Sequence, residues 1–187
     1  MPGERVYPEA VAGEFPAPPV SFADREGRDV EVRPFQEADD EAAVVDALVA
    51  MYDDFDPADR AQGVPPVGER RVREWLETLL EQDGFDVVAW HGDEVAGHAT
   101  LVPDDDDTYE LAIFVHQSYQ GAGIGTHLIE ALLGHAQANG AELVWLSVER
   151  WNRPAVALYE KVGFETASAE SFEMEMAVRL SGGGDSS

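Results

Sequence analysis

Apolar and polar residues recur along the chain with two different periods, and these periods predict a series of strands and helices. Residues 29–34 alternate apolar and charged side chains, which predicts a strand. Residues 37–52 and 70–80 carry apolar side chains at helical spacing, which predicts two amphipathic helices. A loop containing proline and glycine, residues 53–67, joins these helices.

The rest of the chain continues in the same manner, with turn residues between the periodic segments. Gly92-Asp93 predicts a hairpin, the acidic run 104–107 predicts the next turn, and Asn139-Gly140 predicts a helix end. The predicted strands are 85–91, 94–102, 108–115, 142–148, 164–166 and 172–178, and the predicted helices are 124–138 and 153–162.

The predicted order is β-α-α-β-β-β-α-β-α-β-β, without an internal repeat. Such an order favours one α/β domain whose mixed central sheet has about seven strands and about four helices. We expect an irregular, proline-rich extension at residues 1–27, the domain at 28–180 and a flexible tail at 181–187.

Composition narrows the class of protein. The 187 residues, 44% of them hydrophobic, are enough for one domain with its own core. No apolar run reaches the roughly 18–20 residues that cross a membrane, and the N-terminus does not resemble a signal peptide. The chain has no cysteine, which excludes disulfides, a thiolate nucleophile and cysteine-based metal sites. A cytoplasmic protein is the expected result.

Charge is the most unusual bulk property, because the chain has 38 acidic and only 12 basic residues and therefore a net charge of -26. Such a surface repels nucleic acid and anionic membranes, so neither is an expected partner. The acids serve either as a patch for a cationic substrate or as an adaptation of the whole surface to high salt. Their spread along the chain, with Lys161 as the single lysine, favours adaptation to a halophilic cytoplasm.

A glycine-rich turn is the first candidate for chemistry. Residues 120–125, Gln-Gly-Ala-Gly-Ile-Gly, lie between the predicted strand 108–115 and the following helix. Bare backbone N–H groups beside a helix N-terminus favour an anion such as a pyrophosphate. An ordinary helix-start turn is the alternative.

A second block, residues 152–164, follows at the distance that one strand and one helix create. Gln120, Gly123 and Gly125 fit the pattern Gln/Arg-x-x-Gly-x-Gly/Ala, and Asn152-x-x-Ala-x-x-Leu-Tyr159-x-x-x-Gly-Phe fits a second signature. Over roughly residues 29–180 the chain resembles the Gcn5-related N-acetyltransferase (GNAT) superfamily. This resemblance implies the GNAT fold and acetyl-CoA as co-substrate, with no metal; the histidines show no metal-ligand spacing.

The resemblance also implies where the co-substrate binds. Backbone amides of Gly121, Ala122, Gly123, Ile124, Gly125 and Thr126 would hold the pyrophosphate, and Gln120 stands where relatives often carry arginine. That exchange forfeits a charge-assisted bond, so phosphate binding would rest on the backbone. Ile113, Phe114 and Val115 would pair with the pantetheine arm like an added strand, and the Val115 N–H would polarise the thioester carbonyl. Asn152 would bind pantetheine or cap its own helix.

Transfer to an amine requires an acid and a base. The resemblance implies that Tyr159 protonates the departing thiolate, whereas a core tyrosine is the alternative. Glu110 is the first choice for the base, because a half-buried carboxylate with a raised pKa can act through a water. A surface acid without a catalytic role is its alternative, and Glu149 and His116 are further candidates for the base.

The expected reaction is direct attack of a primary amine on acetyl-CoA in a ternary complex, without a covalent enzyme intermediate. The acceptor is a small-molecule amine or a protein lysine or N-terminus, and Asp53, Asp54 and Asp56 in the loop 53–67 are candidates to receive it. A non-catalytic acyl-CoA sensor is the alternative function. Relatives are often dimers, so a homodimer is possible.

The acidic surface predicts that salt stabilises the protein. We expect the melting temperature to rise between low salt and molar KCl, because salt screens the repulsion among carboxylates. Thermal unfolding followed by circular dichroism measures this, and a cooperative transition at one unchanged temperature would contradict the halophilic interpretation.

Overall fold

The computed structural model describes residues 5–59, 65–104, 107–169 and 173–181. Its strands form one sheet in the order β1-β2-β3-β4-β5-β6-β8-β7. The strands are β1 Val20–Ala23, β2 Asp29–Pro34, β3 Phe85–His91, β4 Glu94–Pro103, β5 Tyr109–Val115, β6 Leu143–Glu149, β7 Glu165–Ala169 and β8 Glu173–Arg179. The helices are α1 Glu41–Asp53, α2 Glu69–Leu80, α3 Ile124–Ala138 and α4 Arg153–Val162, and the 3-10 helices are η1 Phe35–Glu37, η2 Pro57–Asp59 and η3 Gln117–Tyr119.

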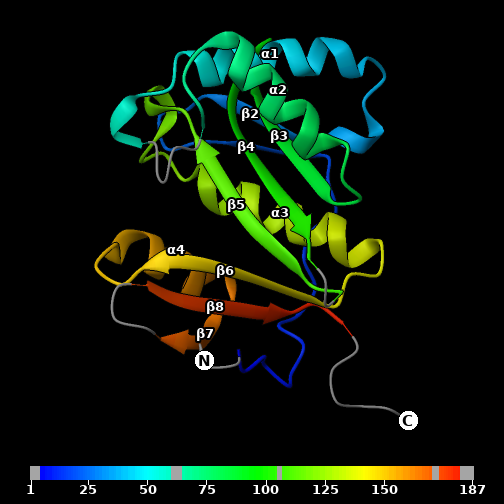
Figure 1. Cartoon of the computed structure of the whole chain (residues 1–187), viewed down its shortest axis with the longest axis vertical. Helices are drawn as coiled ribbons and strands as arrows, with labels where there is room; N and C mark the ends of the chain where they lie inside the picture. Colours follow the sequence, from blue (N-terminus) through cyan, green and yellow to red (C-terminus); the bar gives the residue numbers. More distant parts are fainter. Residues whose placement is uncertain (1–4, 60–64, 105–106, 170–172, 182–187) are drawn as a thin grey trace.

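Helices cover both faces of the sheet (Figure 1). One face packs against α1 and α2, with Leu48, Tyr52 and Leu76 fully buried between them and the strands. The other face packs against α3 and α4 through a larger cluster that includes Leu128 and Leu132. A two-sided core of this kind is what the sequence pattern of strands and amphipathic helices predicts.

The predicted mixed α/β sheet is confirmed, and most elements lie within a few residues of their predicted bounds. The sheet of the described residues has eight strands rather than about seven, because residues 1–27 are not irregular throughout. Val20–Ala23 forms β1 and pairs antiparallel with β2, so the prediction of a strand-free extension is wrong there. The tail at 182–187 and part of the loop 53–67, residues 60–64, lie outside the described residues.

β5 and β6 run parallel and pair only where they begin. Their register joins Tyr109 to Val144 and Glu110 to Trp145, and no later pair is formed between these two described strands. Beyond that point the two strands diverge toward their C-terminal ends (Figure 1). On their other sides both strands stay fully paired, β5 with β4 and β6 with β8. The sheet therefore opens between β5 and β6, and the site described below is built around this opening.

The segment before β1 is fastened to the body of the domain. The Ala12 N–H donates to the Arg179 carbonyl at 3.0 Å, and the Gln137 side chain of α3 bonds to the backbone of Gly13 and Phe15. A Cβ built on Gly134 of α3 would lie 2.1 Å from the Pro16 carbonyl oxygen. Only glycine at position 134 lets this segment approach α3 so closely.

Gly134→Ala is therefore expected to lower the melting temperature despite the higher helix propensity of alanine. The clash is with a backbone atom that cannot move aside easily, so its cost lies toward the upper end of the about 1–3 kcal/mol typical of overpacking and exceeds the roughly 1 kcal/mol that alanine gains in a helix. Gly125→Ala in the same helix is the matched control, because its Cβ would make ordinary contacts of 3.6 and 3.8 Å. Equal melting temperatures for the two variants would contradict this account.

Candidate functional site

The glycine-rich turn connects η3 to α3 at the open end of the sheet. Gly121 and Gly123 have φ angles of 74° and 88°, a left-handed conformation that favours glycine. Gly123 occupies the N-cap position of α3 and makes no side-chain cap. The first amides of the helix therefore keep their capacity to bind an anion, supported by the helix dipole.

Gln120 does not extend toward a ligand at these amides. Its Nε2 donates to the carbonyl oxygen of Val115 at 2.9 Å and so fixes the end of β5. Gln120, which the resemblance places in the co-substrate-binding segment, thus has its side-chain amide engaged with β5.

Arg25, in the turn between β1 and β2, lies against the glycine-rich turn. Its backbone N–H donates to the Ala122 carbonyl at 3.0 Å, and its Nη1 lies 3.5 Å from the Gly121 carbonyl oxygen. The guanidinium is exposed, and its Nε lies 3.6 Å from the position that a Cβ on Gly123 would take. Sequence reasoning missed this residue. The signal that could have found it is the closeness of Arg25 and Arg28, because two of only 12 basic residues in one turn indicate a site for an anion.

Asp24 holds this β1–β2 turn in shape. The buried carboxylate accepts from the backbone N–H groups of Glu26 and Arg28, both at 2.9 Å, and from the Arg28 Nε at 2.7 Å. Burial alone would raise the pKa of Asp24, but the hydrogen bonds from Arg28 and Glu26 and the charge of Arg28 lower it overall. Asp24 therefore stays ionised near neutral pH and keeps Arg25 beside the glycines.

The backbone of β5 faces the opening with every second residue. The His116 N–H bonds to Ala96 in β4, and hydrogen bonding alternates along an antiparallel pair. The N–H and C=O groups of Leu111, Ile113 and Val115 therefore point away from β4, toward the gap beside β6. Phe114 directs its backbone to β4 instead, and its side chain packs with the α1–α2 cluster.

α4 begins beside the open end. Asn152 caps it, accepting from the Ala155 N–H at 3.3 Å, so the capping role that the sequence left open is present. Leu158 of α4 and Ile113 of β5 both approach Gly125 of α3, which joins the three elements. Tyr159 packs against the core shared with α3, and burial raises its pKa to about 12.

Glu110 is the last residue of β5 that pairs with β6, and its side chain is exposed on the face that carries α1 and α2. Loss of part of its hydration raises the pKa of Glu110; Arg5 lowers it, and Asp104 and Glu175 raise it further. Tyr159 belongs to the opposite face. The two predicted catalytic groups, Glu110 and Tyr159, thus lie on opposite faces of the sheet.

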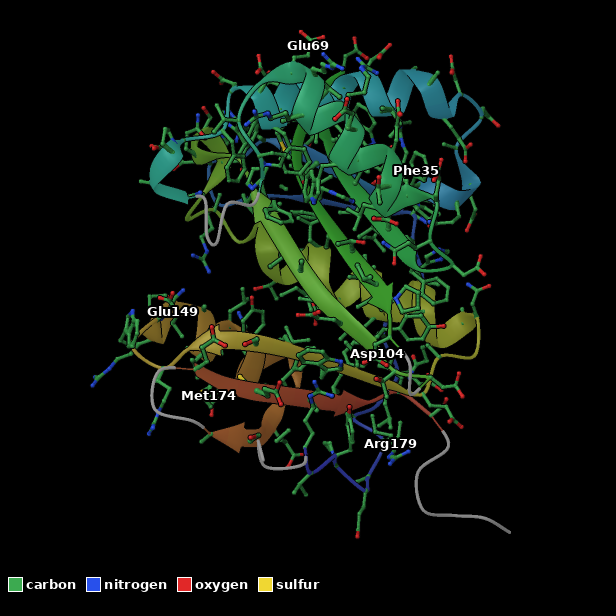
Figure 2. All side chains as sticks on the ribbon, viewed as in Figure 1. Phe35, Glu69, Asp104, Glu149, Met174 and Arg179 are labelled. Carbon is green, nitrogen blue, oxygen red and sulfur yellow. The ribbon has the colours of Figure 1, made fainter. Side chains whose placement is uncertain are left out.

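The two other candidate bases differ in their surroundings. The His116 Nδ1 accepts from the Ser118 N–H, so its Nε2 is the protonated nitrogen that donates to Asp54 at 2.9 Å. Both ring nitrogens are therefore engaged, which disfavours His116 as a base. Glu149 is exposed at the end of β6, at the wide end of the opening, whereas Asp104 lies at the closed end (Figure 2).

The acidic residues after α1 have local partners. Asp54 binds His116, its carbonyl accepts from the Gln117 Nε2 at 2.7 Å, and Asp56 accepts from the Ala58 N–H at 2.9 Å. These bonds tie the described start of the loop 53–67 to η3. Asp53 is exposed at the end of α1.

Another polar cluster is enclosed in the core. The Tyr52 hydroxyl lies 2.6 Å from the His98 Nδ1, and the His98 Nε2 lies 2.8 Å from Asp86. All three residues are at most 2% exposed, so this chain of hydrogen bonds fastens α1 to β3 and β4. The described part of the chain contains no group of three acidic or histidine residues placed to hold a metal. None of its described helices is long and apolar enough to span a membrane.

Solved structures share this architecture. The GNAT domain of S. lividans PAT superposes with a TM-score of 0.71 at 17% identity, covering 86% of this chain and 96% of that one. The Salmonella typhimurium protein yncA, solved with its cofactor acetyl-CoA, gives a TM-score of 0.63 at 19% identity, covering 81% and 94%. At these identities the likeness shows the fold.

Sequence comparison gives the family. A mycothiol acetyltransferase of Saccharomonospora viridis is 32% identical over 150 residues, which are 75% of this chain and 47% of that protein. Another, from Corynebacterium glutamicum, is 37% identical over 81 residues, 43% of this chain and 28% of that protein. The chain thus spans less than half the length of these relatives. The acetyltransferase (GNAT) family pattern matches residues 48–164, and the chain belongs to this family.

Proposed function

We propose that the protein transfers the acetyl group of acetyl-CoA to a primary amine by direct attack in a ternary complex. The observation that carries this proposal is the opening between β5 and β6. There the two strands stop pairing with each other, and the N-terminus of α3, which has no side-chain cap, lies beside the opening. A long, amide-rich ligand with a pyrophosphate at one end has the chemistry that fits such a site.

The described residues fit acetyl-CoA along its length. The amides at residues 121–126 would receive the pyrophosphate, with the Arg25 guanidinium as the neighbouring positive charge. The N–H and C=O of Ile113 and the N–H of Val115 would pair with the amides of the pantetheine arm, because they point into the opening, whereas the Val115 carbonyl already accepts from Gln120. The Asn152 Oδ1 already caps α4, which leaves its Nδ2 to donate to pantetheine.

Acetyl-CoA supplies an activated acetyl thioester, and the chain supplies the proton transfers. Glu110, on the α1–α2 face, accepts a proton from the attacking ammonium, directly or through a water. One of the two β5 N–H groups that point into the opening, that of Ile113 or that of Val115, stabilises the negative charge that develops on the carbonyl oxygen. Tyr159, on the other face, donates its phenolic proton to the departing thiolate, and a pKa of about 12 keeps that proton in place until it is needed.

The acceptor enters from the face that carries Glu110. The name of the mycothiol acetyltransferases favours a small-molecule amine over a protein lysine as the acceptor class. The negative surface around Glu110 also favours a cationic amine, because it raises the local concentration of cations.

Free-thiol release from acetyl-CoA, measured with a panel of small amines and lysine peptides in molar KCl, tests this function. We expect turnover with at least one amine, and a loss of about 10²-fold in kcat for Glu110→Gln and Tyr159→Phe. Because burial raises the pKa of Glu110, the acidic limb of the pH profile of kcat/KM should lie above the usual glutamate range. Because burial raises the pKa of Tyr159 to about 12, deprotonation of Tyr159 should not lower kcat/KM below about pH 10. Binding of acetyl-CoA without turnover would instead identify a sensor.

Arg25→Ala tests the phosphate end alone. We expect CoA to bind about five- to tenfold more weakly, because an exposed charge-assisted contact is lost while the backbone bond to Ala122 remains. Calorimetric titration with CoA and with pantetheine, which lacks the phosphates, measures this. Arg33→Ala, in β2, is the matched control. An equal loss for pantetheine, or none for CoA, would contradict the role of Arg25.

A further inference from the structure

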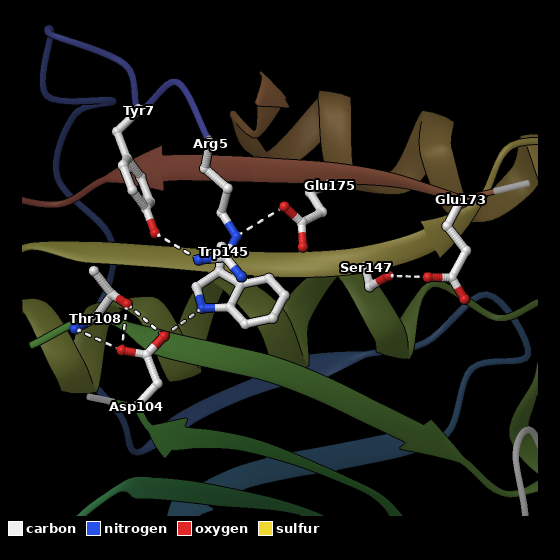
Figure 3. Close-up of polar contacts among 8 residues, drawn as sticks. All are labelled: Arg5, Tyr7, Asp104, Thr108, Trp145, Ser147, Glu173 and Glu175. Atoms are coloured by element: carbon white, nitrogen blue, oxygen red, sulfur yellow. Dashed lines mark hydrogen bonds and ion pairs between the residues drawn. The ribbon is translucent and has the colours of Figure 1, made fainter. Parts of the chain in front are cut away.

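A ring of acidic groups surrounds an indole at the closed end of the opening, on the face that carries Glu110. Trp145 of β6 is the register partner of Glu110 in β5. Its Nε1 donates to Asp104 at 2.8 Å, and the Thr108 hydroxyl donates to the same carboxylate, so the plane of the indole is fixed (Figure 3). Glu175 of β8 lies across the indole from Asp104 (Figure 3).

A cation from the chain itself occupies this place. The Arg5 guanidinium carbon lies 3.5 Å from the centre of the Trp145 ring, and its Nε lies 2.9 Å from a Glu175 carboxylate oxygen. The Arg5 Nη1 donates to the Tyr7 hydroxyl at 3.3 Å. Arg5 also lies near enough to Glu110 to lower the pKa of that carboxyl. An aromatic face combined with carboxylates is the chemistry that recognises a guanidinium or ammonium group.

The attachment of Arg5 is separate from the bonds that fasten the rest of the N-terminal segment. Those bonds are made further along the chain, where Pro8 accepts from the Arg179 Nε at 2.7 Å and Ala12 binds the Arg179 carbonyl. Before Pro8, Val6 contributes one backbone bond, to the Ala167 carbonyl at 3.0 Å. Residues 5–7 can therefore leave the indole while the segment stays anchored from Pro8 onward.

We propose that Trp145 and Glu175, next to Glu110, form a subsite for a second cationic group of the amine acceptor, a guanidinium or an ammonium, and that Arg5 fills this subsite until the acceptor displaces it. The inference rests on the proposed acetyl transfer for the identity of the acceptor. The reacting amine lies at Glu110, and the second cation lies over Trp145 in place of Arg5. The acceptor is thus a compact molecule that carries two positive charges, and the N-terminal segment competes with it.

Calorimetric titration with two amines of equal backbone length tests this subsite without acetyl transfer. Agmatine carries a primary amine and a guanidinium, whereas N-acetylputrescine carries the same amine and a neutral amide. We expect Arg5→Gln to bind agmatine about tenfold more tightly than the wild type and N-acetylputrescine unchanged. Adding Glu175→Gln should remove the gain, and Arg33→Gln, which also breaks an arginine–glutamate pair, should give none.

A readout on the wild-type protein keeps the test independent of how well Arg5→Gln folds. Hydrogen exchange of the Val6 amide should become faster when agmatine is added, because displacement of Arg5 frees the residues around it. Unchanged agmatine affinity in Arg5→Gln, an equal gain for both amines, or unchanged Val6 exchange would each overturn the subsite. Thiol release that fails with every amine would refute the acetyl transfer and leave these binding results standing.

Discussion

The early end of pairing between β5 and β6 is the constraint on which the site depends. Buried backbone N–H and C=O groups need partners, and a strand that loses its neighbour must find them elsewhere. From Leu111 to Val115 every second peptide group is directed into the gap. Such an edge, held inside a sheet rather than at its border, is prepared for an extended ligand that carries amides of its own.

The opening persists because each flanking strand is secured on its other side. β6 pairs with β8 over its whole length, and β5 pairs with β4 up to Gly97 and Val115. A Cβ on Gly97 would lie 2.9 Å from the Phe114 carbonyl oxygen and 2.8 Å from Leu128, so glycine there lets α3 approach β4 and β5 closely. Gln120 then fixes the Val115 carbonyl from the far end. These contacts make the opening a preorganised feature of the fold.

Local periodicity was sufficient to predict nearly every element, because each depends on which face of one helix or strand is apolar. β1 was missed because four residues after a proline-rich stretch show too little alternation to be distinguished from an irregular segment. The predicted extent of the glycine-rich turn and the capping role of Asn152 also follow from local sequence.

Contacts between distant segments were beyond that reasoning. Arg25 meets Gly121 across 96 positions and Arg5 meets Trp145 across 140 positions, so neither pairing has a period or a spacing to reveal it. The separation of Glu110 and Tyr159 onto opposite faces likewise depends on the register of β5 and on the packing of α4. Only the folded structure supplies these relations.

The distribution of the few positive charges then explains how so acidic a chain can receive an anionic co-substrate. Arg25 and Arg28 gather beside the glycine-rich turn, where the Arg28 Nη1 donates to the Ser118 carbonyl at 3.1 Å. At the closed end of the opening, carboxylates surround Trp145 instead. The opening therefore has an exposed arginine at the turn and a group of carboxylates at its closed end. Because fields of opposite sign orient ligands as they approach, this polarity favours a polyanion at the turn and a cation at Trp145, with the acetyl group between them.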